Sequence, residues 1–196
     1  NGIVGPVLLG GAVATFFTGS NFIVAKGNIT DSLQPVISHW ANASRGLDVL
    51  LNPWVVVFGI AVVFLARILG TLYINNNVDD AIIRGRVRKQ LLINTVLFLV
   101  FFLPFLIVTL IGEGYAVNAS GVVFMEPMKY LNNLIAMWPL AVVLLVGVLL
   151  LLFGIIKTIA SPAYTRGIWP AGIGVVLVVL VLFLIAGWNN TAYYPS

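Results

Sequence analysis

Residues 51–90 read LNPWVVVFGIAVVFLARILGTLYINNNVDDAIIRGRVRKQ, an apolar run followed by a polar and basic one. The run 54–74 has about the 20 residues that a helix needs to cross the hydrocarbon core of a bilayer. Basic residues gather in the loop 75–90, and loops rich in lysine and arginine stay on the cytoplasmic side of a membrane. This stretch therefore predicts a transmembrane helix that ends at the inner face.

The composition of the whole chain agrees with a membrane protein. Of its 196 residues, 61% are hydrophobic and 8% are charged, whereas soluble domains carry about 25% charged residues. The chain has no cysteine and one histidine, His39, which excludes disulfides, thiolate metal sites and iron–sulfur clusters. One histidine and three methionines also make a poor set of haem ligands. We expect an integral membrane protein that holds no cofactor or metal of its own.

The other apolar runs extend this interpretation to the rest of the chain. None of them alternates polar and apolar residues as a barrel strand would, and a helix satisfies its own backbone groups in lipid. We predict an all-α, polytopic transmembrane helical bundle that forms a single domain over 1–196. The first run is short and fits a helix cut at its start. The predicted spans are about 3–17, 54–74, 91–112, 134–156 and 168–187.

The distribution of basic residues predicts the orientation of the bundle. The loops 75–90 and 157–167 together hold six lysines and arginines, whereas the segments 18–53, 113–133 and 188–196, which are longer in total, hold three. By the positive-inside rule the first two are inner loops and the other three are outer. The N-terminus then lies near the inside and the C-terminal tail outside. Tryptophans at the predicted span edges, where amphipathic rings favour the headgroup level, agree with these boundaries.

Three local features refine the prediction. The segment 44–51 indicates an interfacial helix that Asn52-Pro53 stops before the next span. Asp79 or Asp80 is expected to cap a helix that leads into the third span. Pro104, inside that span, is expected to kink it, because proline removes a backbone hydrogen bond.

Arg67 is the sharpest functional candidate. It lies about two turns from the inner end of its predicted span, and a charge inside a span is costly and often functional. A long arginine can also extend its guanidinium to the inner headgroups, and we favour this simpler interpretation. The alternative is a pair with a carboxylate or a cofactor propionate on a partner subunit.

Glu113 and His39 are weaker candidates. Glu113 ends the third span on the outer side, where it could accept a proton or bind a cation, although an ordinary interfacial carboxylate is the simpler interpretation. His39 lies in an outer loop and could sense pH or bind a metal. It has no second histidine or cysteine to complete a metal site, so we favour a surface histidine. The sequence offers no nucleophile–base set and no phosphate loop, so we assign no catalytic residue.

Three stretches together resemble subunit II of cytochrome bd-type quinol oxidases. They are LLNPWVVVFGIAVVFLARILGTLYI at 50–74, the basic RGRVRKQ at 84–90 and IAGWNNTAYYPS at 185–196. In this order and spacing they are most similar to the divergent form found in Bacteroides-like bacteria. The resemblance covers essentially the whole chain. Since members of that family have eight spans, it also implies a fragment that lacks the early spans and the last one.

The resemblance implies a role in a larger complex of the bacterial plasma (inner) membrane. The partner is the haem-bearing subunit I, whose b-type and d-type haems oxidise quinol and reduce dioxygen to water. Subunit II carries no haem and can hold a structural quinone or lipid. No catalytic residue is carried over, and no nucleic acid is expected.

Two other classes of function stay open at this point. One is a piece of a secondary transporter with Pro104 and Arg67 at a midplane site, although inverted repeats and converging polar residues are lacking. The other is a membrane scaffold or assembly protein without chemistry of its own. An oxidase subunit would co-purify with haem held by another chain, whereas a scaffold would bind neither haem nor substrate.

Overall fold

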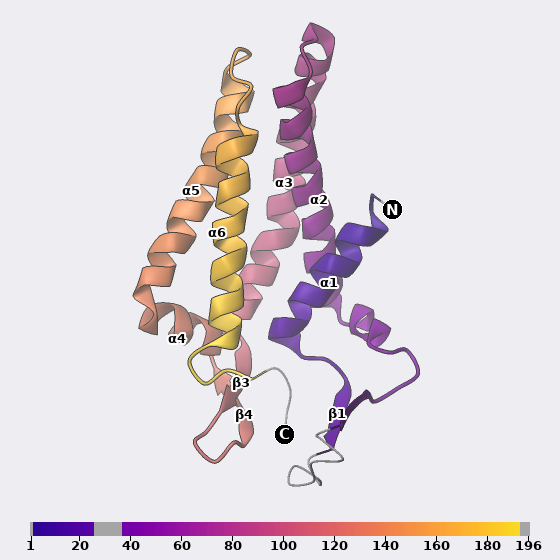
Figure 1. Cartoon of the computed structure of the whole chain (residues 1–196), viewed down its shortest axis with the longest axis vertical. Coiled ribbons are helices and arrows are strands. Elements are labelled where there is room, and N and C mark those ends of the chain that lie inside the picture. Colours follow the sequence, from indigo (N-terminus) through magenta and orange to yellow (C-terminus); the bar gives the residue numbers. More distant parts are fainter. Residues whose placement is uncertain (1, 26–36, 193–196) are drawn as a thin grey trace.

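The structure is a computed structural model that describes residues 2–25 and 37–192. Four long apolar helices, α2, α3, α5 and α6, are able to cross a membrane, and α1 is a shorter apolar helix. They run side by side as an elongated bundle, with α4 across one end (Figure 1). The all-α polytopic fold class is thereby confirmed. The helices are α1 Val4–Thr18, α2 Pro53–Asn77, α3 Ala81–Ile111, α4 Lys129–Ala136, α5 Trp138–Ala160 and α6 Ile168–Gly187.

The long helices pack chiefly in pairs of sequence neighbours, α2 with α3 and α5 with α6. The α5–α6 pair is close because glycines face each other across it. A Cβ placed on Gly154 would lie 2.5 Å from the carbonyl oxygen of Gly167, and one placed on Gly174 would overlap the carbonyl of Gly147. Small residues let helix backbones approach within membranes. Glycine pairing therefore sets the spacing of α5 and α6.

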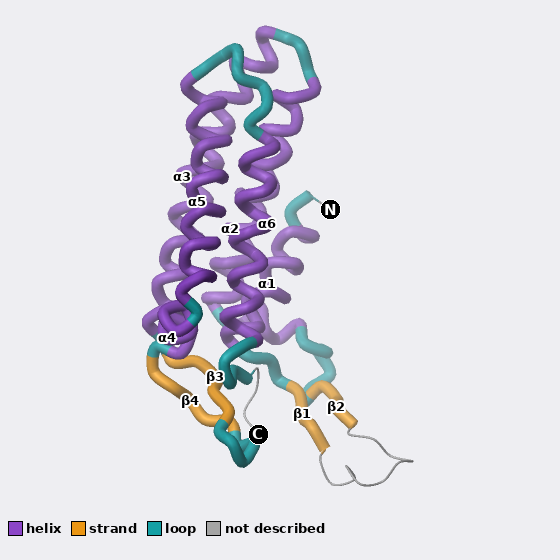
Figure 2. Tube along the Cα trace, turned by 60° about the vertical axis from the view of Figure 1, so that its left-hand side comes forward, coloured by secondary structure: helices purple, strands orange, loops and turns teal. Residues whose placement is uncertain are grey.

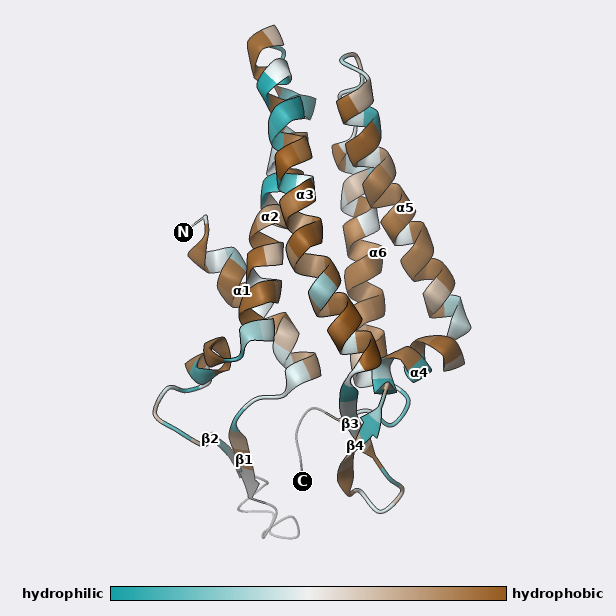
Figure 3. Ribbon diagram, turned by 180° about the vertical axis from the view of Figure 1, so that it is seen from behind, coloured by the Kyte–Doolittle hydropathy of each residue, from teal (hydrophilic) through white to brown (hydrophobic). Residues whose placement is uncertain are grey.

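Two apolar cores fill the bundle, one in each half of its length. The core near α4 includes Phe17, Phe58, Phe105 and Ile185. The other is formed by Ile68, Leu72, Leu91 and further residues of α2, α3, α5 and α6. The helix shafts also carry hydrophobic residues on their outer surfaces, and hydrophilic residues concentrate at the ends of the bundle (Figure 3). This distribution suits a molecule whose sides face acyl chains.

Two small antiparallel hairpins lie at the same end of the bundle (Figure 2). β1 (Phe22–Ala25) pairs with β2 (Ile37–Trp40), and β3 (Glu113–Val117) pairs with β4 (Val123–Pro127). The segment 190–192 adds to the free edge of β3, with Ala116 opposite Thr191. The sequence predicted these regions, 18–53 and 113–133, only as outer loops. Residues 26–36 of the first loop, and 193–196 of the predicted outer tail, lie outside the described residues.

Several predicted boundaries differ from the observed ones. The connection between α2 and α3 is much shorter than the predicted loop 75–90, because α3 already begins at Ala81. The predicted cap is confirmed: the Asp80 carboxylate accepts a 2.9 Å hydrogen bond from the backbone N–H of Ile83. Of the predicted interfacial helix 44–51, the structure has Leu47–Leu51 as a 3-10 turn (η1).

The predicted span 134–156 overlaps α5, and the helix begins later than the predicted span. The structure separates α4 from α5 at Met137, and α5 begins with Trp138-Pro139. Proline is favoured in the first turn of a helix and disfavoured inside one, because it lacks a backbone N–H. α3, by contrast, continues from Ala81 to Ile111 with Pro104 inside it.

Candidate functional site

A cavity of about 270 Å³ opens at the end of the bundle where the hairpins lie. The C-terminal ends of α1 and α3, the start of α2, the β3–β4 hairpin and α4 surround it. Its walls are mainly aromatic, with a smaller number of polar side chains. The aromatic residues are Phe17, Trp54, Phe105, Tyr115 and Tyr130, and the polar ones are Thr18, Asn52, Thr109 and Glu113.

Glu113 is the only acidic residue among the described residues on the wall of this cavity. It is the first residue of β3, directly after Gly112 terminates α3, and its side chain is exposed. Within 2–25 and 37–192, no basic side chain forms an ion pair with it. The structure thus places Glu113 on the wall of a cavity. The sequence analysis identified this residue but did not predict the cavity.

A second cavity of about 320 Å³ adjoins the first and shares Thr18, Asn52 and Tyr115 with it. Asp48 of η1 lies on its wall. The Ser44 hydroxyl donates to one Asp48 oxygen at 2.7 Å, and the Asn21 amide donates to the other at 2.5 Å. Hydrogen bonds from Ser44, Asn21 and Asn42 lower the pKa of Asp48 to about 2, because they stabilise the charged form. Asp48 is therefore ionised at neutral pH.

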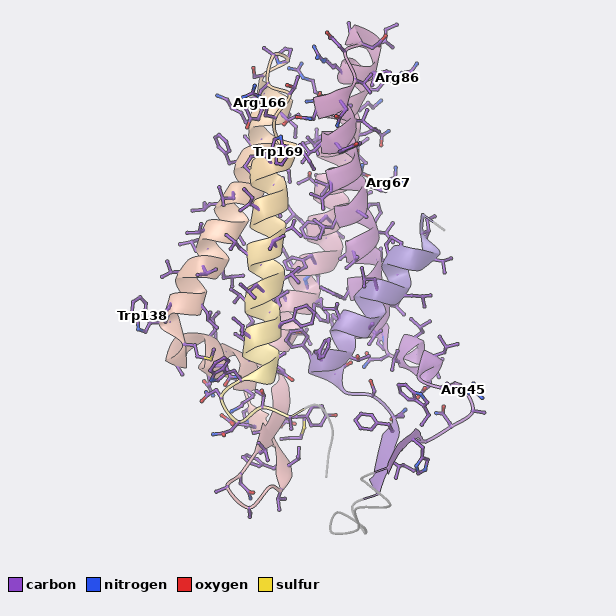
Figure 4. All side chains as sticks on the ribbon, in the orientation of Figure 1. Arg45, Arg67, Arg86, Trp138, Arg166 and Trp169 are labelled. Atoms are coloured by element: carbon purple, nitrogen blue, oxygen red, sulfur yellow. The ribbon has the colours of Figure 1, made fainter. Side chains whose placement is uncertain are left out.

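Arg67 lies on the exposed side of α2 and projects sideways from the bundle (Figure 4). Ala66 and Gly70 on the same helix are exposed too, and a Cβ placed on Gly70 would meet no atom within 4 Å. The described residues provide no ion-pair partner for Arg67. Its guanidinium therefore faces the surroundings of this chain rather than its core.

His39 is an exposed residue of β2, opposite Ile23 of β1. Among the residues that the structure describes, no group of three His, Cys, Asp or Glu residues could hold a metal ion. Among the described residues, no ion pair joins any two of His39, Arg67 and Glu113. The three sequence candidates thus lie on three separate elements and do not form one site.

A polar network around α4 was missed by the sequence analysis. The Lys129 ammonium, 5% exposed, donates to the backbone carbonyl of Asn189 at 3.0 Å and pairs with Glu126 at 3.1 Å. The fully buried Asn133 donates to the carbonyl of Ile185 at 2.8 Å and accepts a bond from the Asn189 amide at 3.0 Å. Because the last carbonyls of α6 lack helical partners, these bonds anchor that end of the bundle.

The sequence did contain a signal for this network. Lys129 and Asn133 are four residues apart, a spacing that places two side chains on the same face of a helix. The predicted boundaries leave both residues in the outer loop 113–133, so the sequence analysis did not predict a shared helix face for them. Buried polar groups need hydrogen-bond partners, and the network supplies them for Lys129 and Asn133.

Arginines of the predicted inner loops and of the predicted outer segment lie at opposite ends of the bundle. Arg86 and Arg166, from the two loops predicted to be inner, lie at one end of the bundle, whereas Arg45 lies at the other end with the hairpins (Figure 4). Four apolar helices of spanning length, with polar groups gathered at their ends, define a polytopic helical membrane protein.

The comparison with known families is specific. The family model of cytochrome bd terminal oxidase subunit II matches residues 1–196, the whole chain. The chain belongs to this family and is a membrane subunit of a terminal oxidase. A search of curated proteins gave no significant match.

Proposed function

We propose that this chain is the non-haem membrane subunit of a cytochrome bd-type quinol:oxygen oxidoreductase. Its haem-bearing partner, subunit I, oxidises quinol and reduces dioxygen to water in the bacterial plasma membrane. The observation that carries the proposal is the family match over the whole chain, on a fold with four membrane-spanning helices. The chain supports this reaction and supplies no catalytic residue.

The side chains present do not suit a haem in this chain. Haem iron is held by a histidine, cysteine, methionine or tyrosine side chain. The chain has no cysteine, and its single histidine, His39, is exposed on a hairpin outside the spanning helices. We therefore assign the b-type and d-type haems to the partner subunit.

The geometry supports a scaffolding role. Close glycine contacts fix α5 against α6, and the α4 network fixes the end of α6. The outer surfaces of α3 and α5 carry large exposed apolar side chains, for example Ile107 and Leu149. Such surfaces suit packing against another membrane subunit or lipid, and a structural quinone is a further proposed ligand.

The proposal is tested by purifying the full-length protein from its native host in a mild detergent. A reduced-minus-oxidised visible spectrum should show b-type and d-type haem signals that track with a larger co-purified chain. A His39→Ala variant should keep the same haem-to-protein ratio. A colourless preparation of a single chain, or loss of haem in that variant, would contradict the proposal.

A further inference from the structure

The outer cavity has an unusual charge balance for a basic protein. The chain as a whole has a net charge of +4, yet the described residues that line the two adjoining cavities include Glu113 and Asp48 and no lysine, arginine or histidine. Asp48 already accepts hydrogen bonds from Ser44 and Asn21, whereas Glu113 has no ion-pair partner among the described residues. An anionic ligand would be repelled here, and a cation would be attracted.

The helix ends around the cavity add to this preference. α1 and α3 both point their C-terminal ends at it, and the last carbonyls of a helix carry a partial negative charge. The start of α2 contributes the opposite partial charge. It is, however, capped by the Asn52 side chain, which accepts a 2.9 Å hydrogen bond from the backbone N–H of Trp54. The carbonyls of Phe17, Val108 and Gly112 already accept hydrogen bonds, so these helix ends contribute partial negative charge to the cavity rather than free acceptors.

The aromatic wall also favours a cation. Trp54 and Tyr115 line the cavity beside Glu113, and the faces of such rings attract ammonium groups. Trp54 lies in the first turn of α2, at the position where tryptophans mark the headgroup level of a membrane. Pockets for drug-sized ligands measure about 300–1,000 Å³. A volume of about 270 Å³ therefore suits a lipid headgroup better than a whole lipid.

We propose that this outer cavity binds the primary ammonium group of an amine-headed phospholipid, with Glu113 as its counter-ion. A primary ammonium offers three N–H donors, which suit the Glu113 carboxylate and the Thr109 hydroxyl, two acceptor groups of residues on the cavity wall. A trimethylammonium headgroup has no donor, and an anionic headgroup has the wrong charge. This site is independent of the proposed oxidase function, because it requires neither haem nor quinol.

The test uses the full-length complex in detergent, stripped of native lipid, and native mass spectrometry. Dioleoyl phosphatidylethanolamine, phosphatidylcholine and phosphatidylglycerol are added one at a time. We expect tightest retention of the ethanolamine lipid, and about tenfold weaker retention in Glu113→Gln, because a charge-assisted hydrogen bond is lost. Asp79→Asn is the matched control. It removes the same charge at the far end of the bundle, where Asp79 pairs with Arg84, and should retain the lipid as the wild type does.

Three results would overturn the proposal. The first is equal retention of all three lipids by the wild-type complex. The second is unchanged retention in Glu113→Gln. The third is full displacement of the lipid by millimolar free ethanolamine, which would indicate a soluble amine ligand instead. If Glu113→Gln does not assemble, Glu113→Asp keeps the charge. It should then preserve the headgroup preference, and loss of the preference there would count against the site.

Discussion

Asp48 shows how three hydrogen bonds change the acidity of one side chain in a loop. Its pKa falls to about 2, below the ordinary value for aspartate of about 3.9, because Ser44, Asn21 and Asn42 stabilise the carboxylate. A group whose pKa is lowered on folding stabilises the folded state above its unfolded pKa. That stabilisation is lost as the pH falls through the folded value.

We therefore expect hydrogen-exchange protection of 42–52 to stay constant from about pH 8 to pH 4 and to fall between about pH 4 and 2. Hydrogen exchange with mass spectrometry, corrected for intrinsic rates, measures this. In Ser44→Ala the largest cause of the lowered pKa is missing, so the folded pKa lies closer to the unfolded one, and the fall should be smaller and end at a higher pH. Identical profiles for the two proteins would contradict this assignment.

Arg67 differs from Asp48 in that the surroundings of its side chain are not formed by this chain. Its side chain is exposed and has no ion-pair partner among the described residues. We expect the guanidinium to reach the inner headgroups, as the sequence suggested. Under this interpretation it contributes little to assembly.

Arg67→Leu should then leave the haem-to-protein ratio of the purified complex unchanged and shift its free energy of unfolding by less than about 0.5 kcal/mol. Thermal unfolding measures the change in the free energy of unfolding, and the visible spectrum measures the haem-to-protein ratio. Ala66→Leu, at the neighbouring exposed position, is the control. Loss of haem in Arg67→Leu with recovery in Arg67→Lys would instead indicate a carboxylate or propionate partner on the other subunit.

At the scale of elements, the α5–α6 pair is a contact that leaves no room for a side chain at Gly174. A Cβ on Gly174 would lie 2.6 Å from the backbone nitrogen of Leu151, and backbone atoms cannot move away as the end of a side chain can. Gly172, on the same helix, has no atom within 4 Å of its Cβ position. The two glycines differ in surroundings while sharing one helix.

Gly174→Ala should destabilise the protein by about 1–3 kcal/mol, since overpacking forces the helices apart. Gly172→Ala should be neutral or stabilising, by up to about 1 kcal/mol, because alanine favours helix over glycine. Thermal unfolding in detergent compares the two. Equal loss of stability in both variants would show that the α5–α6 spacing does not depend on Gly174.

The elements also show where sequence reasoning succeeded. Hydropathy located all four long helices, because a run of about 20 apolar residues has the length that one helix needs to cross the hydrocarbon core. The β3–β4 hairpin was missed because its strands are short, although its turn did carry a signal. The Asn118 side chain accepts bonds from the backbone of Ser120 and Val122, and Gly121 takes a positive φ of 80°.

The candidate site was less predictable than the fold. Glu113 was identified as a residue, but the cavity beside it depends on Phe17, Trp54 and Tyr130, which are far apart in the sequence. Such convergence has no periodic signature. Arg67 and His39 were identified from their residue types alone, and their exposure could be learned only from the packing.

At the scale of the whole molecule, the two ends of the bundle differ in charge and in structure. Arg86 and Arg166 share one end, and the two hairpins share the other (Figures 2 and 4). The predicted orientation, with the basic end inside, follows from the positive-inside rule.

This orientation can be measured with single cysteines, since the chain contains none of its own. Arg86→Cys should react with a membrane-impermeant maleimide only after cells are opened. Ala119→Cys, at the exposed tip of the β3–β4 hairpin, should react in intact cells. The reverse pattern would show that the bundle is inserted the other way round.

The pairing of sequence neighbours, α2 with α3 and α5 with α6, bears on biogenesis. Each pair can enter the bilayer as a helical hairpin, with its short connection and the basic residues near that connection left on the side of synthesis. Only the segments that carry the hairpins and α4 then have to be translocated, and among their described residues only Arg45 and Lys129 are lysine or arginine. Most packing contacts become available as soon as each pair is complete, so assembly need not wait for distant parts of the chain.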